Sequence, residues 1–317
     1  MSNWILPIAF SSSALISVLT TPFVSWIGRR FEITDQSHDK TPSGQTKITA
    51  KTTPRTGGMG LFVSVFIPFF ILTSFSWQSI QILTGCLLIT LLMVVDDKYS
   101  LPPWIKFIAQ VVSATPPVLA GFRISYLTNV FGSGWLSVGW LSIPLTYLWI
   151  IIVMNAVNFI DGLDGLASGI TIIACVAGAI ASLSRGMLAP AVLLLCLAGA
   201  CAGFLPFNFQ PASIFLGDSG SHLIGYLIAI SAIWGTAKAT TAVVLLVSIL
   251  TLFIPMADVF YSALRRIFKR KSPFVGDMDN LHYQLIKKGW SVKTVVITFY
   301  TITAFFSALA LYIFVLR

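Results

Sequence analysis

The sequence predicts an all-α fold, a polytopic integral membrane helix bundle formed by a single domain over residues 1–317. Three observations predict this class. Apolar residues make up 56% of the chain and charged residues only 10%, against roughly 45–50% and 25% in a typical soluble domain. The mean hydropathy is +0.88. Long apolar runs also recur along the chain, and the acidic residues lie between them or at their ends.

Most of the apolar runs are about as long as a membrane-spanning helix. About 20 apolar residues in helical form cross the hydrocarbon layer of a bilayer. The runs lie near residues 4–27, 57–73, 79–95, 103–121, 140–157, 165–183, 187–205, 221–234, 240–264 and 293–315. We therefore expect about ten transmembrane helices.

The charged residues predict how these helices are oriented. With ten crossings, one face of the membrane receives all the acidic residues: Glu32, Asp35, Asp39, Asp96, Asp97, Asp161, Asp164, Asp218, Asp258, Asp277 and Asp279. A carboxylate at mid-bilayer costs roughly 2.5–3.5 kcal/mol, so acids in such proteins mark a site or meet water. The same face receives all of the twenty Lys and Arg residues except Arg123, Arg185, Lys238 and Arg317.

The positive-inside bias places that face in the cytoplasm and both termini outside. We thus expect a multi-pass protein of the cytoplasmic (inner) membrane. The net charge of +9 reflects this topology and an attraction to anionic headgroups or phosphorylated substrates. No nucleic-acid partner is expected.

The connection after the first run ends in Lys51-Thr-Thr-Pro54-Arg55-Thr-Gly57-Gly58-Met-Gly60. Glycines at a helix N-terminus let backbone amides approach a ligand, and neighbouring Lys and Arg favour phosphate. A small-residue face for helix packing would have the same composition. This motif alone does not decide between the two.

The third run ends in Asp96-Asp97, and Lys106 lies one turn into the next run. Adjacent carboxylates repel each other, which raises the proton affinity of one of them or creates a place for a divalent cation. The alternative is a solvated helix end. It is disfavoured because an acidic pair at a helix C-terminus opposes the helix dipole.

The most specific motif runs from Asn155 through Asn158, Asp161 and Asp164 to Ala167. Its two aspartates are three residues apart and each precedes a glycine, which predicts a tight turn with projecting carboxylates. A plain turn needs only one Asp-Gly pair. Such a turn suits magnesium or the hydroxyls of a ribose.

Two further polar segments follow. The first runs from Asn208 through Phe215 to Gly217-Asp218-Ser219, where Asp218 or Ser219 could simply cap the next helix. The second contains a basic run at 265–271 and a short predicted helix near His282. The basic run could equally serve as an anchor to lipid headgroups.

Taken in order, five motifs resemble the polyprenyl-phosphate N-acetylhexosamine-1-phosphate transferase family, of the glycosyltransferase 4 type. They are the Pro54-Arg55-x-Gly-Gly loop, Asp96-Asp97, the Asp161 and Asp164 turn, Gly217-Asp218-Ser-Gly-Ser, and Pro255-x-x-Asp258. The similarity covers residues 51–289. This family includes transferases that begin lipid-linked teichoic acid and O-antigen lipopolysaccharide synthesis. It is related to phospho-N-acetylmuramoyl-pentapeptide transferase.

The resemblance implies an enzyme that transfers an N-acetylhexosamine 1-phosphate from a UDP-amino sugar to a polyprenyl phosphate such as undecaprenyl phosphate. UMP is released, and Mg²⁺, or alternatively Mn²⁺, is the cofactor. The catalytic loops are then cytoplasmic. Whether the chain forms a homodimer stays open.

The resemblance also implies roles for individual residues. Asp218 is the expected magnesium ligand, and the expected catalytic residues are Asp96, Asp97 and Asp161. The expected substrate-binding residues are Lys51, Arg55, Lys106, Asn158, Asp164, Asn208, Phe215 and His282.

Two segments depart from the family pattern. Much of the N-acetylhexosamine branch has His-x-His-His where this chain has Asn280-Leu281-His282-Tyr283, which leaves the amino sugar undetermined. The Thr- and Lys-rich segment 35–53 has no physical explanation. The competing interpretations are the muramoyl-pentapeptide activity, a membrane transporter, and a lipid-binding scaffold without catalysis.

Overall fold

The computed structural model describes residues 4–35, 52–128, 135–234 and 281–313. Its helices are α1 Ile5–Arg30, α2 Gly57–Leu72, α3 Trp77–Tyr99, α4 Pro103–Leu119, α5 Ser142–Ile160, α6 Leu166–Ser184, α7 Leu188–Asn208, α8 Gly217–Ile233, α11 Leu281–Lys287 and α12 Val292–Leu311. Two antiparallel strand pairs complete the described elements: β1 Thr34–Asp35 with β2 Thr53–Pro54, and β3 Tyr126–Thr128 with β4 Trp135–Ser137. A short 3-10 helix, Gly139–Leu141, precedes α5.

Six of the described helical segments are long and apolar enough to cross a membrane. They are α1, α3, Gly139–Ile160 with α5, α6, α7 and α12. An all-α membrane bundle is therefore confirmed. The total of about ten spans stays a prediction, because α2 is shorter and the run at 240–264 lies outside the described residues.

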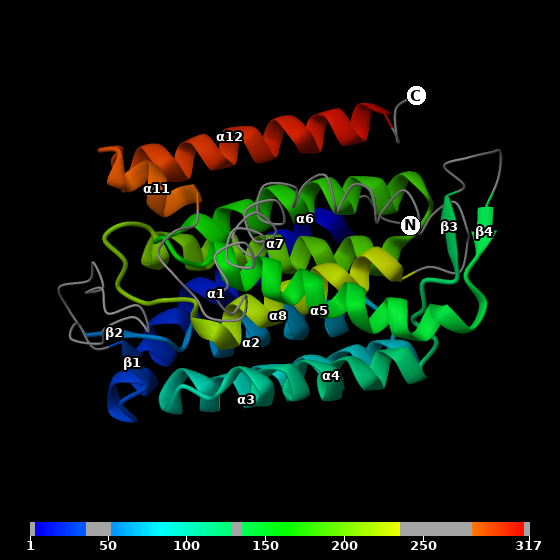
Figure 1. Ribbon diagram of the computed structural model, residues 1–317, viewed down its shortest axis with the longest axis horizontal. Helices are drawn as coiled ribbons and strands as arrows, with labels where there is room; N and C mark the ends of the chain where they lie inside the picture. Colours follow the sequence, from blue (N-terminus) through cyan, green and yellow to red (C-terminus); the bar gives the residue numbers. More distant parts are fainter. Residues whose placement is uncertain (1–3, 36–51, 129–134, 235–280, 314–317) are drawn as a thin grey trace, which may run out of the picture.

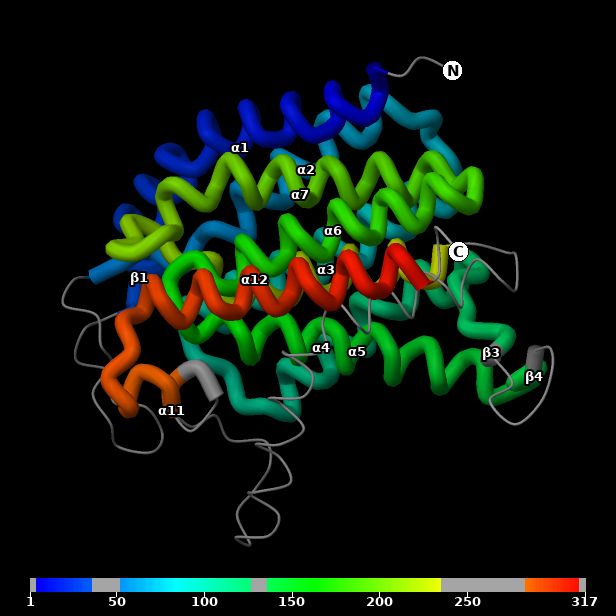
Figure 2. Tube along the Cα trace, turned by 90° about the horizontal axis from the view of Figure 1, so that it is seen from above, coloured from blue at the N-terminus to red at the C-terminus, as the bar shows by residue number. Residues whose placement is uncertain are grey.

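Helix α8 forms the centre of the bundle, and all of its residues are buried. It packs against α2, α3, α5 and α7. Figure 1 shows α3 and α4 along one side of the bundle and α12 along the opposite side. Helix α12 packs on α6, α6 on α7, and α7 on α1, as the view in Figure 2 also shows.

The two ends of the bundle differ. The start of α1, the end of α12 and the β3–β4 pair lie at one end, and the β1–β2 pair lies at the other (Figure 1). An even number of crossings would place the start of α1 and the end of α12 at the same end in this way. Helix α3 ends, and α4 and α8 begin, at the β1–β2 end, so their polar terminal residues gather there.

Helices α1 and α7 pack closely because small residues line their contact. The buried face of α1 consists of Ala9, Ser13, Ser17, Thr21, Val24 and Gly28. Small residues let helix backbones approach each other in a membrane. On α7, a Cβ atom added to Gly199 would overlap the carbonyl oxygen of Phe10.

We therefore predict that Gly199→Ala separates α1 from α7 and destabilises the protein by about 1–3 kcal/mol, as overpacking does. Thermal unfolding of the purified protein in detergent measures the effect. Gly60→Ala in α2 is the matched control, because a Cβ there meets only side-chain atoms, the nearest being a Val24 methyl at 3.2 Å. Equal unfolding midpoints for the two variants would contradict the prediction.

Candidate active site

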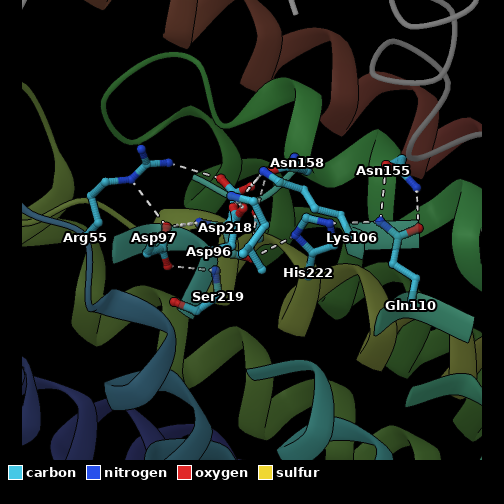
Figure 3. A network of polar contacts seen from close by, with 12 residues as sticks. Arg55, Asp96, Asp97, Lys106, Gln110, Asn155, Asn158, Asp218, Ser219 and His222 are labelled. Atoms are coloured by element: carbon cyan, nitrogen blue, oxygen red, sulfur yellow. Dashed lines mark hydrogen bonds and ion pairs between the residues drawn. The ribbon is translucent and has the colours of Figure 1, made fainter. Parts of the chain in front are cut away.

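Charged residues from four segments meet at the β1–β2 end of the bundle (Figure 3). Arg55 lies just before α2, Asp96 and Asp97 lie in the last turn of α3, Lys106 lies in the first turn of α4, and Asp218 lies in the first turn of α8. We call these five residues the charged cluster. The structure thus brings together five of the residues that the sequence predicted for the site.

Asp218 is the centre of the charged cluster because each of its carboxylate oxygens faces a cation. Its Oδ1 lies 3.0 Å from Nη2 of Arg55, and its Oδ2 lies 2.7 Å from Nζ of Lys106. Lys106 Nζ also lies 2.6 Å from Oδ2 of Asp96, and Arg55 Nε lies 3.3 Å from Oδ1 of Asp97. Three carboxylates therefore share two cations.

The environment keeps Arg55 charged. Burial by itself lowers the pKa of its guanidinium. The neighbouring carboxylates of Asp97 and Asp218 outweigh burial, and the pKa of Arg55 is raised above its ordinary value. Arg55 therefore remains a cation throughout the physiological pH range.

Asp97 caps the N-terminus of α8. Its Oδ1 accepts a hydrogen bond from the backbone N–H of Asp218 at 2.8 Å, and its Oδ2 accepts one from Ser219 at 3.0 Å. The Asp97 side chain is fully buried. These amides have no partner within the helix, and the positive end of the helix dipole favours a carboxylate. The cap of α8 therefore comes from α3, 121 residues earlier in the chain.

Gly217 makes this cap possible. Its φ is +75°, in the left-handed region that favours glycine. A Cβ atom there would lie 2.7 Å from Oδ2 of Asp97 and 2.6 Å from the carbonyl oxygen of Arg55. Any side chain at this position would push α3 or the segment before α2 away from α8.

The glycine-rich start of α2 is bonded to the chain just before α8. The amide of Gly57 donates to the carbonyl of Phe215, and that of Gly58 donates to Leu216, each at 3.1 Å. In return, the amide of Phe215 donates to the carbonyl of Pro54 at 2.8 Å. The structure thus favours the packing interpretation for these two glycine amides. Phe215 itself is half-buried.

Asp96 joins the charged cluster to the α3–α4 connection. Its Oδ1 accepts a hydrogen bond from the amide of Leu101 at 2.8 Å, and its Oδ2 faces Lys106. Its side chain is almost fully buried. One oxygen of Asp96 therefore shapes the turn, and the other faces the same cation as Asp218.

The Asp161–Gly165 turn between α5 and α6 lies beside the charged cluster and is held by its neighbours. Asp164 Oδ2 accepts a hydrogen bond from the amide of Ala212 at 3.1 Å. The hydroxyl of Tyr283 in α11 donates to the carbonyl of Gly162 at 2.8 Å, and that of Tyr300 in α12 donates to Gly165. The two C-terminal helices thus fix this turn.

Burial raises the pKa of both aspartates in the turn. The pKa of Asp161 is well above its ordinary value because burial outweighs the opposing attraction of Arg55. The pKa of Asp164 is also raised by burial, and the hydrogen bond from Ala212 partly offsets this. Both carboxyl groups therefore hold protons more readily than in water.

Two predicted asparagines lie near the turn with protein partners. Asn158 Oδ1 accepts a hydrogen bond from the hydroxyl of Ser221 at 2.7 Å. Asn208 accepts one from Ser168 at 2.9 Å and donates to the carbonyl of Ile214 at 3.1 Å. Asn208 is nearly fully buried, so its visible role is to hold the segment before α8.

Two predicted substrate-binding residues remain. Lys51 lies outside the described residues, as do Asp258 of the fifth motif and Asn280 of the altered last motif. His282 lies in α11, but the direction of its side chain lies outside what the structure describes.

The charged cluster fits a magnesium ion held partly by substrate. No group of three or more His, Cys, Asp or Glu side chains suited to a metal occurs within residues 4–35, 52–128, 135–234 and 281–313. Magnesium, however, commonly takes only one or two carboxylates and completes its shell with water and phosphate oxygens. Oδ2 of Asp96 and Oδ2 of Asp218 converge from two helices on one cation, the Lys106 ammonium. Two carboxylate oxygens, the ligand type that Mg²⁺ prefers, therefore lie next to the same cationic group.

Sequence reasoning assigned no role to a polar group behind the charged cluster. It consists of Gln110 on α4, Asn155 on α5 and His222 on α8. A signal for two of them was present, since Gln110 follows Lys106 by four residues and His222 follows Asp218 by four. Residues at this spacing share a helix face.

Comparison with known proteins identifies the family. The profile of glycosyl transferase family 4 matches residues 79–236. The chain is 33% identical over 305 residues to the probable undecaprenyl-phosphate N-acetylglucosaminyl 1-phosphate transferase of Bacillus subtilis (strain 168), covering 96% of this chain and 84% of that protein. The chain belongs to glycosyl transferase family 4. The resemblance predicted from the five motifs is thereby confirmed.

Other relatives represent both branches of the family. The decaprenyl-phosphate N-acetylglucosaminephosphotransferase of Mycobacterium leprae (strain TN) is 31% identical over 325 residues, with 91% of this chain and 79% of that protein covered. The phospho-N-acetylmuramoyl-pentapeptide-transferase of Halalkalibacterium halodurans is 30% identical over 319 residues, with 95% of each chain covered.

The cap on α8 generates a prediction. Asp97→Asn keeps one acceptor oxygen where two amides now bond, so we expect a loss of about 1–3 kcal/mol of stability and faster hydrogen exchange at Asp218 and Ser219. Thermal unfolding and exchange measured by mass spectrometry test this. Asp164→Asn is the control, because its carboxylate accepts one amide and an asparagine oxygen can replace it. Unchanged exchange at the start of α8 in Asp97→Asn would show that the cap is dispensable.

Proposed function

We propose that the protein transfers an N-acetylhexosamine 1-phosphate from a UDP-amino sugar to a polyprenyl phosphate such as undecaprenyl phosphate, releasing UMP and beginning a lipid-linked cell-envelope glycan. The observation that carries the proposal is the position of Asp218 at one end of an apolar bundle. Its carboxylate contacts both Arg55 and Lys106. The names of the relatives in the N-acetylglucosamine branch support the same reaction.

The position of the charged cluster suits two substrates of opposite character. A polyprenyl chain dissolves in the bilayer, and a sugar nucleotide dissolves in water, so their phosphates can meet only near the ends of the helices. The charged cluster lies at such an end. A transporter would instead hold its binding residues near the bilayer midplane on interrupted helices.

The charges of the cluster suit phosphoryl transfer, which depends mainly on neutralising phosphate charge and aligning the nucleophile. Arg55 and Lys106 now neutralise carboxylates, and they can turn to phosphate oxygens when substrate binds. Asp218 would then hold Mg²⁺, which as a Lewis acid stabilises charge on the diphosphate. Substrate binding would therefore exchange the ionic partners of Asp218, while Nε of Arg55 keeps its contact with Asp97.

The other predicted residues have catalytic, positioning or substrate-binding roles. Asp96 orients or deprotonates the lipid phosphate, and Asp161 is a further catalytic residue near Arg55 and Asp218. Asp97 contributes by fixing the start of α8. Contacts to the UDP-sugar come from Asn158, Asp164, Asn208 and Phe215, and from Lys51 and His282.

Release of UMP tests the proposed function. Purified protein is incubated with undecaprenyl phosphate and, separately, with UDP-N-acetylglucosamine, its galacto epimer, their 6-deoxy analogues and UDP-muramoyl-pentapeptide. We expect UMP from an N-acetylhexosamine donor. A preference for UDP-muramoyl-pentapeptide would support the second candidate, which the similarity to the Halalkalibacterium halodurans protein favours. No UMP with any donor would refute both.

Metal dependence is a separate prediction. EDTA should abolish UMP release, and Mg²⁺, or more weakly Mn²⁺, should restore it. Asp218→Asn should lower kcat/KM by at least about 100-fold, or about 2.7 kcal/mol of transition-state stabilisation. Asp164→Asn should instead raise KM for the UDP-sugar with little change in metal dependence. Activity that survives EDTA would contradict the proposal for Mg²⁺.

The charged cluster is proposed to face the cytoplasm, with both termini outside. The four native cysteines are buried, so single introduced cysteines can be labelled against a low background. In intact cells, an impermeant maleimide should label Ser137→Cys in the β4 strand and leave Lys288→Cys unlabelled until the membrane is opened. Both positions are exposed in the bundle. The reverse pattern would overturn the orientation.

A further inference from the structure

A second cross-helix contact lies directly behind the charged cluster. Lys106 and Gln110 are one turn apart on α4, and Asp218 and His222 are one turn apart on α8. Lys106 faces the Asp218 carboxylate, and Gln110 Nε2 lies 3.0 Å from Nε2 of His222. Gln110 is 3% exposed and His222 is 1% exposed. The two helices thus share one ionic contact and one uncharged polar contact on the same faces (Figure 3).

The orientation of Gln110 is determined from α5. The backbone carbonyl of Ile151 can only accept, so Asn155 must direct its Nδ2 toward it, at 2.8 Å. The second hydrogen of that Nδ2 is donated to Oε1 of Gln110 at 3.0 Å. Gln110 Nε2 must then face the other way, toward Oδ1 of Asn155 at 3.3 Å and toward His222.

This orientation determines which nitrogen of His222 carries the proton. Gln110 Nε2 is a donor only, so Nε2 of His222 must accept. A neutral imidazole has one donor and one acceptor nitrogen. The proton therefore lies on Nδ1, which is 2.8 Å from the backbone carbonyl oxygen of Asp218 and donates to it.

We propose that His222 is a positioning residue for Asp218. In its neutral Nδ1–H tautomer, His222 accepts a hydrogen bond from Gln110 on α4 and donates one to the backbone carbonyl of Asp218. These two bonds connect the first turn of α8 to α4. The first turn of a helix has the fewest internal hydrogen bonds, and a reacting group displaced by about 1 Å can lose about 100-fold in rate. His222 thus holds the backbone from which the Asp218 side chain projects.

The tautomer is tested by nitrogen NMR on the full chain in detergent at neutral pH. The chain has three histidines, so the double variant His38→Asn, His282→Asn leaves His222 as the sole ¹⁵N-histidine signal. We expect a protonated Nδ1 and an unprotonated Nε2. A proton on Nε2, or on both nitrogens, would overturn the proposal.

An isosteric change at Gln110 tests the direction of the contact. Gln110→Glu, made in the same double variant, replaces the Nε2 donor by an acceptor oxygen. Nε2 of His222 should then become protonated as well, because Nδ1 still faces the Asp218 carbonyl oxygen, which can only accept. A spectrum that keeps the proton on Nδ1 alone would show that Gln110 does not determine the protonation of Nε2.

Kinetic variants test the positioning role, which rests on the proposed transferase function. His222→Phe should lower kcat by about 10- to 100-fold with less than about 3-fold change in KM for the UDP-sugar. His222→Asn, whose Nδ2 can donate to the Asp218 carbonyl, should recover most of the rate. Equal losses in the two variants, or losses that follow their thermal unfolding midpoints, would refute positioning. Wild-type protein without any UMP release would refute the transferase function, and the NMR result would still decide the tautomer.

Discussion

The buried N-terminus of α8 is the constraint on which the rest of the structure depends. A helix that begins inside an apolar bundle exposes amides that neither water nor the helix itself can bond. Asp97 supplies acceptors for two of them. A buried carboxylate in turn requires a cation, which is Arg55. One helix start therefore obliges α3, α8 and the segment before α2 to meet at one point.

The same constraint explains why the contacts along α4 and α8 become less polar with distance from the helix starts. Ionic contacts lie at the helix starts, where Lys106 meets Asp218. One turn deeper, the contact between Gln110 and His222 carries no formal charge. Beyond it α8 is lined by apolar residues such as Tyr226 and Ile230. Charge is thus confined to the outermost turn, where burying it is least unfavourable.

Sequence reasoning predicted most of the long described helices well because each is an apolar run. The run at 165–183, for example, coincides with α6 within one residue at each end. The strand pairs were not predicted, because segments of two or three residues carry no periodic pattern. Motifs predicted that Arg55, Asp96 and Asp218 belong together. They could not predict that Asp97 caps α8, since that depends on the packing of segments far apart in the chain.

The contacts of Tyr283 and Tyr300 with the Asp161–Gly165 turn bear on how the protein is made. The turn leaves the ribosome well before α11 and α12, yet these two helices supply its hydrogen bonds. A chain whose synthesis stops before α12 can insert its earlier helices but lacks the groups that hold this turn. Assembly of the site therefore waits for the last described helix, which makes the completed bundle a condition for catalytic geometry.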